Sequence, residues 1–323
     1  MFKTCLRAAV LLAVSFCLPV QAQSYPDRPI SLIVPGPAGG TPDVVARLVG
    51  EKLRARLGQQ IVIENRAGAS GFIGVSAAAR AQPDGYTLLM GFAQTMAVNP
   101  AIFKKLPYDP LTDFAPIAKL AEFELVLAVP ATLPVKTVPE LVKWMKENKG
   151  KESFGSFGAG SPSQFAGEIF SRKAGLDAQH VAYKGSAPLV TDLVGGQVQY
   201  GFVVLQVAQQ LAKAGKIRLL AVTGTERQPA APDLPTMTEL GYPDVVATGW
   251  YGLYAPAGTP EPVLTRLETE VKAVMSEPDL QRQLQEQGIR PAYSARSALL
   301  SYVKDEIKNW RSIVQKTGFT ALD

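Results

Sequence analysis

Residues 30–57 read ISLIVPGPAGGTPDVVARLVGEKLRARL and join a short apolar run to a helical pattern through a glycine-rich turn. The run ISLIV at residues 30–34 predicts a buried strand. Over residues 41–57 apolar side chains recur at helical spacing, and Gly58 follows as a helix-ending signal. A strand, a tight turn and a helix in direct succession indicate α/β layering over a largely parallel sheet.

The same alternation continues along the chain and makes the expected fold class α/β. Three helices are expected near the C-terminus, beginning near Pro260, Pro278 and Ala298. Residues 99–113 are rich in proline and turn residues, which predicts a surface loop. Further strands, with helices between them, are predicted at residues 61–64, 86–90, 125–129, 153–157, 180–183, 198–204, 217–222 and 250–255.

Residues 1–22 have the pattern of a signal peptide. Lys3 and Arg7 precede an apolar stretch from Ala8 to Leu18, and small residues follow at 20–22. The stretch is shorter than the roughly 20 residues that span a bilayer, so we expect cleavage, export to the periplasm and a soluble mature chain. Both cysteines lie in this leader, so the mature chain is expected to hold no disulfide and no thiolate metal site.

The mature chain is long enough for two domains. Residues 23–323 number 301, more than one core usually accommodates. The helices that end the chain need a sheet to cover, and the economical arrangement packs them on the first sheet. We therefore expect a discontinuous first domain of residues 23–124 plus 248–323 and a second domain of residues 125–247. Two crossings between domains make a hinge, and ligands in such folds lie between the lobes.

The charge balance is mildly positive. The chain has 33 basic and 28 acidic residues, and two of the basic ones, Lys3 and Arg7, belong to the leader. The remaining charges are scattered without a basic block, which argues against nucleic acid as a partner. A mild positive balance suits anionic ligands, although many proteins without such ligands share it.

The turn at residues 34–43 predicts an anion site. Thr41 is expected as the helix N-cap and Pro42 as the first helical residue, because a hydroxyl can accept an amide bond and proline lacks only an unpaired amide. The remaining free amides lie at the positive end of the helix dipole, and the glycines let a ligand approach them. Asp43 either orients a ligand or only favours the helix N-terminus.

A related arrangement occurs at residues 153–163, SFGSFGAGSPS, where Ser161 is the expected N-cap. If the two domains face each other, the two helix starts converge on opposite ends of one ligand. The alternative stays open, because Thr259-Pro260 makes the same pattern where we expect no site. Capping by itself indicates only that a helix begins.

The sequence argues against an enzyme. Gly39-Gly40 lacks the Gly-Lys-[Ser/Thr] ending of a P-loop, and neither a dinucleotide fingerprint nor a nucleophile elbow occurs. His180 is the only histidine and is interpreted as a structural side chain. A hydrolase built on Ser156 or Ser161 would then need Asp, Glu or Lys as its base. We expect no catalysis, no cofactor and no bound metal.

Seven segments follow one another in a specific order: VPGPAGGTPDVVAR at 34–47, VIENRAGASG at 62–71, PDGYTLL at 83–89, LPYDP at 106–110, HVAYKG at 180–185, DLVGGQV at 192–198 and WYGLYAPAGTP at 250–260. Several of them alone are ordinary turns. Together they cover nearly the whole mature chain and resemble the periplasmic solute receptors of tripartite tricarboxylate transporters, often called Bug proteins.

The resemblance implies a two-lobed periplasmic-binding-protein fold, the Venus flytrap fold, with two α/β domains around a hinge. Its ligand, commonly a carboxylate, is held in the cleft by the loops at 38–43 and 156–164 through amides, hydroxyls and waters. The turn after Met90 would add contacts from the first domain. The residues expected at the ligand are Ala38, Gly39, Gly40, Thr41, Asp43, Phe92, Gln94, Thr95, Ser156, Gly158, Ser161, Ser163, Gln164 and Val203.

The resemblance also implies partners, namely the membrane permease subunits of a tripartite tricarboxylate transporter, and we expect the receptor to be a monomer. A sensor that presents its ligand to a membrane signalling partner uses the same fold and stays open. Three positions depart from the family pattern: Gly36 stands for an aromatic residue, Gln164 for a histidine and Val203 for an aspartate. Our hypothesis is a roomier, less polar pocket that prefers an aromatic or longer carboxylate to aspartate or glutamate.

Overall fold

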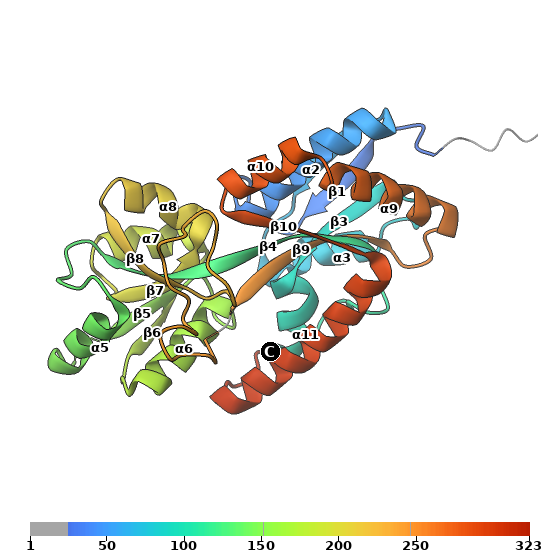
Figure 1. The fold of residues 1–323 in the computed structure, drawn as a ribbon. Helices are drawn as coiled ribbons and strands as arrows, with labels where there is room; N and C mark the ends of the chain where they lie inside the picture. The colour runs from blue at the N-terminus through green and yellow to red at the C-terminus, as the bar shows by residue number, and fades with distance from the viewer. Residues whose placement is uncertain (1–24, 151, 246) are drawn as a thin grey trace, which may run out of the picture.

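The computed structural model describes residues 25–150, 152–245 and 247–323, which form two α/β lobes (Figure 1). The expected leader at residues 1–22 lies outside the described residues. Among the helices of the described part, none has the length and apolar character that crossing a membrane requires.

The first lobe is built on a mixed sheet. β1, β2 and β3 run parallel, β9 pairs with β3 in the antiparallel sense, and β4 lies between β9 and β10. The strands are β1 (Ile30–Val34), β2 (Ile61–Asn65), β3 (Thr87–Phe92), β9 (Thr248–Pro256) and β10 (Ile289–Ala295). The helices are α2 (Thr41–Leu57), the 3-10 turn η1 (Ala69–Gly71), α3 (Phe72–Ala79), the π-helical turn η2 (Gln94–Val98), α4 (Asn99–Ile102), α9 (Glu261–Met275), α10 (Pro278–Glu286) and α11 (Arg296–Thr317).

The second lobe repeats the plan with fewer elements. β7 lies between β4 and β5, β6 forms the far edge, and β8 pairs with β4. The strands are β5 (Ser153–Ser156), β6 (Gln179–Ala182), β7 (Tyr200–Val204) and β8 (Ile217–Val222), and the helices are α5 (Val138–Glu147), α6 (Pro162–Ala174), α7 (Ser186–Val194) and α8 (Leu205–Lys213).

One strand belongs to both lobes. β4 (Phe114–Pro130) is 17 residues long, and Glu124 is its last residue opposite β9, where it faces Thr248. The next residue, Leu125, lies opposite Val204 of β7. Figure 1 shows β4 and β9 side by side where the lobes join. The lobes are therefore linked by paired strands rather than by a flexible linker.

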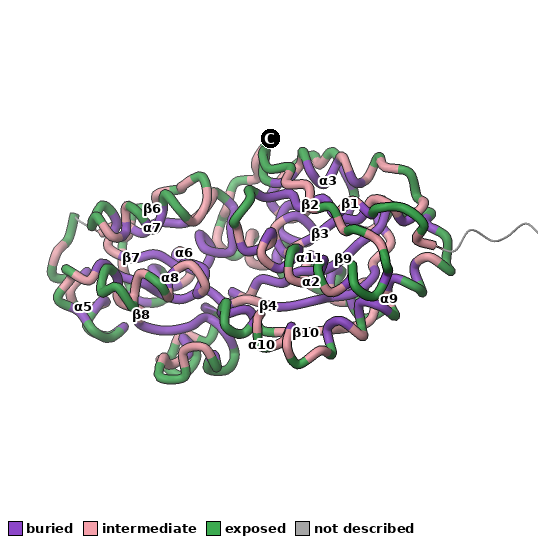
Figure 2. Tube along the Cα trace, turned by 90° about the horizontal axis from the view of Figure 1, so that it is seen from above, coloured by how far each residue is buried: buried purple, intermediate pink, exposed green. Residues whose placement is uncertain are grey.

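The apolar run that opens the fold is buried on both faces, as expected for a strand inside an α/β sheet. Ile30, Leu32 and Val34 pack in one cluster with residues of α2 and α9. Ile33 points the other way, into a cluster with residues of α3 and α11. Figure 2 shows the buried interior continuing through the strands of both lobes.

Three expectations about secondary structure are wrong in part. The strand predicted at 125–129 begins at Phe114, because pairing with β9 and β10 overrides the proline and charges of its first half. Residues 289–295 form a strand that no pattern predicted. The segment 99–113 is not wholly a surface loop, since it opens with α4 and since Tyr108 is buried and donates a 2.6 Å hydrogen bond to the Thr95 carbonyl.

Candidate functional site

Helix α2 begins one residue earlier than the capping pattern predicts. Gly40 is the N-cap, with φ −71° and ψ 160° and no side-chain cap, so the prediction of Thr41 as N-cap is wrong. Thr41 is already helical, and its Oγ1 donates a 2.9 Å hydrogen bond to Oε1 of Gln206, which lies in α8 of the second lobe. The hydroxyl therefore joins the lobes instead of closing its own helix.

A carboxylate holds the turn before α2. Gly39 has φ +77°, and its amide donates a 2.9 Å bond to Oδ2 of Asp43, which also accepts from Nε of Arg47 at 3.0 Å. Burial alone would raise the pKa of the Asp43 carboxyl, but the bonds from Arg47 and Gly39 outweigh it and hold the pKa below its usual value. Its other oxygen, Oδ1, is buried without a partner among the described residues.

The start of α2 leaves amides available. The amide of Gly40 donates to the Pro37 carbonyl and that of Val44 to the Gly40 carbonyl. Within the described residues, the amides of Thr41 and Asp43 have no acceptor. They lie in the first turn, where the helix dipole favours a negative charge.

Helix α6 begins with a side-chain cap, which confirms Ser161 as its N-cap. Ser161 Oγ accepts a 3.3 Å bond from the Gln164 amide and donates a 2.6 Å bond to the Gly158 carbonyl. Gly160 has φ +69°, and its amide donates to Oε1 of Gln164 at 2.7 Å. The third residue inside the helix thus reaches back to a left-handed glycine, as Asp43 does at α2.

The strand before α6 ends in a serine–histidine pair. Ser156 Oγ lies 2.7 Å from Nε2 of His180, whose ring stacks on Phe154 with centroids 5.0 Å apart. We expected that a base for Ser156 or Ser161 would have to be Asp, Glu or Lys. This expectation is wrong for Ser156, because pairing of β5 with β6 brings the His180 imidazole to its hydroxyl. Burial lowers the pKa of His180 and keeps the ring neutral near pH 7.

The pair lacks the other parts of a catalytic triad. Ser156 is fully buried, so its hydroxyl is closed to substrate. Among the described residues, no carboxylate hydrogen-bonds to His180 to orient the ring. Ser156 Oγ instead donates to the Gly158 carbonyl at 3.0 Å, so the pair holds the loop that leads into α6.

Each of the two helix starts meets the opposite lobe. The start of α2 bonds to Gln206, whose Nε2 donates back to Gln287 of the first lobe at 3.4 Å. At α6, a methyl group on Gly160 would come within 2.4 Å of Ile102 Cδ1 and 3.5 Å of the Phe319 ring. The structure therefore brings both predicted loops to the junction of the lobes, although against different elements.

The remaining predicted residues differ in exposure. Ala38 and Gly39 are exposed, and Phe92, Gln94 and Gly158 are half-buried. Gln94 and Thr95 lie in the π-helical turn η2. Thr95 is buried and hydrogen-bonds to the backbone of Phe92, and Gln94 Nε2 donates to Asn99 at 2.8 Å. Such turns recur at functional sites. Two others face inward in the second lobe: Ser163 donates to the Phe202 carbonyl, and Val203 lies in an apolar cluster.

The sequence matches a known family over most of its length. Residues 45–319 match the family described as "Tripartite tricarboxylate transporter family receptor". The chain belongs to this family. Protein BugT of Bordetella pertussis is 34% identical over 301 residues, which cover 93% of this chain and 92% of BugT.

Solved structures agree with this receptor in fold. The Rpa4515 protein of R. palustris with adipate superposes with a TM-score of 0.87 at 35% identity and covers 92% of this chain and 100% of its own. MatC of Rhodopseudomonas palustris with bound malate gives a TM-score of 0.80 at 33% identity over 90% of this chain and 100% of its own. The two-lobed periplasmic-binding-protein fold implied by the sequence is therefore confirmed.

The receptor belongs to a family of periplasmic solute-binding proteins, and its members are receptors rather than enzymes. The buried serine–histidine pair is consistent with a structural role in this setting. In the part of the chain that the structure describes, no group of His, Cys, Asp and Glu side chains is arranged to hold a metal ion.

The sequence did not indicate two contacts between the lobes of the receptor. One is Gln206, described above. The other is Arg172 of α6, whose Nη1 and Nη2 donate to the carbonyls of Lys316 and Thr317 at 2.7 and 3.0 Å. These carbonyls end α11, where a cation is favoured by the helix dipole. Each of these two contacts joins residues more than 140 positions apart in the sequence, so no local signal marks it.

Proposed function

We propose that this receptor binds a small carboxylate between its lobes and delivers it to the permease subunits of a tripartite tricarboxylate transporter. The observation that carries the proposal is the start of α2, where the amides of Thr41 and Asp43 have no acceptor in the described structure while Thr41 Oγ1 bonds to the second lobe. An anion at this point would accept from both amides and lie beside the lobe junction.

The free amides at α2 and the relatives support a carboxylate as the ligand class. Two solved relatives have dicarboxylates, adipate and malate, in their structures. A dicarboxylate spanning the junction could present one end to α2 and the other to the loop before α6. Such a ligand would favour the closed state by its higher affinity for that state.

The domain and export assignments are part of the proposal. The partner change of β4 at Glu124 and Leu125 supports a boundary there, with residues 248–323 returning to the first domain. We propose that residues 1–22 are removed on export and that the mature receptor acts in the periplasm. The intact mass of the receptor recovered from a periplasmic extract tests this, because cleavage at the expected point leaves a chain that begins at Gln23.

The ligand preference remains our hypothesis of an aromatic or longer carboxylate. Gln164 supports it, since a non-titrating amide stands where the family pattern has a histidine, and this amide is already bonded to Gly160 and Glu168. A thermal-shift series with aspartate, malate, adipate and benzoate tests the preference. Stabilisation by aspartate or malate, but by neither adipate nor benzoate, contradicts the hypothesis.

The deciding experiment removes one amide. Thr41→Pro eliminates the amide at the first helical position, where proline is well tolerated, and also removes the hydroxyl. Thr41→Val removes only the hydroxyl and is the matched control. We expect isothermal titration with the best-binding carboxylate to show about a tenfold weaker Kd for Thr41→Pro than for Thr41→Val, the loss of one hydrogen bond to a charged group.

The neutral diol that matches adipate in length serves as the ligand control and should not bind. Equal carboxylate affinity for Thr41→Pro and Thr41→Val, with both variants folded by circular dichroism, contradicts the proposed anion site at α2.

A further inference from the structure

A cavity lies on the surface of the first lobe, beside α4 and α11. Its volume is about 370 Å³, and it is formed by the segment 103–111 and one face of α11. Tyr108 forms part of its lining but turns its hydroxyl inward, donating to the Thr95 carbonyl at 2.6 Å and accepting from Asn99 Nδ2 at 3.1 Å. These bonds fix the cavity wall to the η2 turn. None of the residues expected at the ligand lines the cavity, so the two sites are distinct.

Three cations of α11 line the cavity. Lys304, Lys308 and Arg311 occupy positions i, i+4 and i+7 and therefore share one helix face. Each is exposed, and none has a carboxylate within 4.0 Å in the described structure. Three like charges on one helix face repel one another, and an anion between them would relieve that repulsion.

The remaining charged groups of the lining do not offset these cations. Lys104, also in the lining, is a fourth cation and forms an ion pair at 2.6 Å with Asp323. Asp109 is the only acidic side chain in the lining, and its Oδ1 already accepts from the amides of Leu111 and Thr112 at 2.7 and 3.3 Å. The cavity therefore keeps a net positive charge.

The lining also includes apolar side chains. Phe103, Leu106, Leu111 and Ile307 line the cavity, and Ile307 is only 6% exposed. A concave site that combines apolar side chains with a few convergent polar groups is typical of small-molecule binding. Here four of the five charged side chains in the lining are cations.

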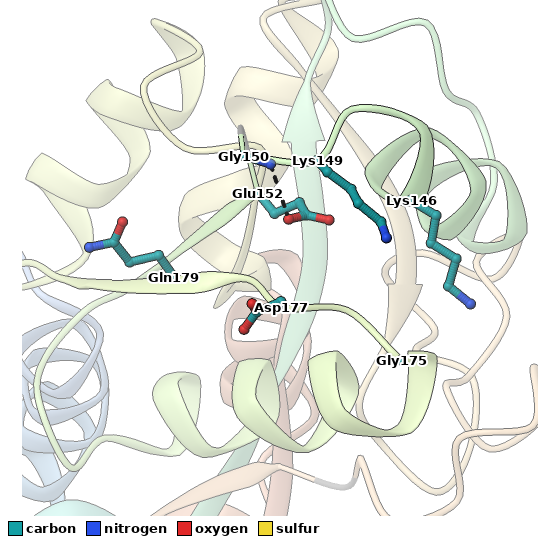
Figure 3. A pocket seen from close by; sticks show the side chains of 7 residues that line it. All are labelled: Lys146, Lys149, Gly150, Glu152, Gly175, Asp177 and Gln179. Atoms are coloured by element: carbon teal, nitrogen blue, oxygen red, sulfur yellow. Dashed lines mark hydrogen bonds between the residues drawn. The ribbon is translucent and has the colours of Figure 1, made fainter.

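A cavity in the second lobe gives the contrast. It has a similar volume of about 400 Å³, but Lys146 and Lys149 are balanced there by Glu152 and Asp177 (Figure 3). The Glu152 carboxylate also accepts from the Gly150 amide at 3.4 Å. Cavity size is therefore nearly the same in the two lobes, while the excess of cations belongs to the first-lobe cavity alone of these two.

We propose that the first-lobe cavity is a second binding site, for an anion with an apolar body such as an aromatic carboxylate or sulfonate. The anionic group lies among Lys304, Lys308 and Arg311, and the apolar body packs on Phe103 and Ile307. The site requires no movement of the lobes, because both of its walls belong to the first lobe.

The test uses anilinonaphthalene sulfonate, a fluorescent aromatic anion, with the folded receptor. A triple variant, Lys304→Gln, Lys308→Gln and Arg311→Gln, removes the three exposed cations. The matched control, Lys146→Gln and Lys149→Gln, removes cations from the other cavity. We expect the triple variant to bind the probe roughly tenfold more weakly than the wild type and the control to bind it unchanged, as the loss of three exposed charge contacts implies.

A second arm tests the need for charge. Phenylnaphthylamine has a similar apolar body without the sulfonate. It should bind the wild type more weakly than the anionic probe does, and it should bind the wild type and the triple variant equally. The proposal is overturned if the triple variant and the control bind the anionic probe equally, or if the neutral probe binds the wild type as tightly. Near-UV circular dichroism of each variant verifies that the fold is retained.

Discussion

The starts of α2 and α6 share one arrangement but differ in the acceptors of their first backbone amides. In each, a glycine with positive φ precedes the N-cap and donates its amide to the third helical side chain, from Gly39 to Asp43 and from Gly160 to Gln164. At α6 the cap is Ser161, whose hydroxyl accepts from the amide of Gln164, the third helical residue.

At α2 the cap is Gly40, which has no side chain, so the amides of Thr41 and Asp43 have no acceptor in the described residues. Within the described residues, similar sequence signals therefore leave two amides without an acceptor at α2 and one, that of Ser163, at α6. The start of α2 thus offers an anion more free amides than the start of α6 does.

The largest expected difference comes from adding a methyl group to each glycine. Gly39→Ala meets no atom within 4 Å and costs only the left-handed conformation, about 1 kcal/mol of unfolding free energy. Gly160→Ala also places Cβ 2.4 Å from Ile102 Cδ1, so we expect about 3 kcal/mol from strain plus overpacking. Urea denaturation measures the unfolding free energy of both variants. Equal losses of this free energy would show that α6 is not packed against the first lobe.

The next effect isolates the cap of α6. Ser161→Ala removes the acceptor of the Gln164 amide and should cost about 1 kcal/mol, whereas Ser161→Gly should cost only a few tenths. Thermal unfolding of the two variants gives the comparison. A loss for Ser161→Gly as large as that for Ser161→Ala would mean that another group than the hydroxyl caps α6.

Local signals predicted much of both helix starts. The span 41–57 for α2 and the cap Ser161 follow from apolar spacing, the [Ser/Thr]-Pro pair and the terminal glycines. The same rule fails at Thr41, because it does not see that Gly40 can take the extended cap conformation and leave Thr41 for the other lobe.

What the sequence could not predict is long-range. His180 reaches Ser156 only because β5 and β6 pair in parallel with Phe154 opposite His180. Gln206 and Arg172 act across the lobe junction, and their partners depend on how the lobes meet. Such contacts have no local periodicity, so tertiary packing alone determines them.

A smaller effect on stability comes from exchanging the caps. Gly40→Ser would give α2 the hydroxyl that α6 has, and serine and glycine caps differ by only a few tenths of a kcal/mol. Its Cβ would lie 3.1 Å from the Pro37 carbonyl, which offsets part of that gain. We expect nearly unchanged unfolding in urea but weaker carboxylate binding by calorimetry, because the new hydroxyl occupies the Asp43 amide. Unchanged affinity would contradict the anion site proposed at α2.

The loops before α6 and before α2 should also lose stability one after the other as the pH falls, with the smallest effect on global stability. Burial depresses the pKa of His180 below 6.5. The contribution of His180 to the free energy of unfolding is therefore present above that pH and is lost as the pH falls through the depressed pKa. The pKa of Asp43 lies below 3.8 despite burial, because the Arg47 and Gly39 bonds prevail, so its contribution is lost only in stronger acid.

Hydrogen exchange measured along a pH series checks this order. The loop before α6 should lose protection first and the loop before α2 only in stronger acid, after correction for the intrinsic pH dependence of exchange. His180→Gln keeps a side-chain hydrogen bond to Ser156 without a titrating group and should abolish the first step, while Asp43→Asn should abolish the second. Loss of the first step in Asp43→Asn instead would mean that the carboxylate, rather than the imidazole, controls both loops.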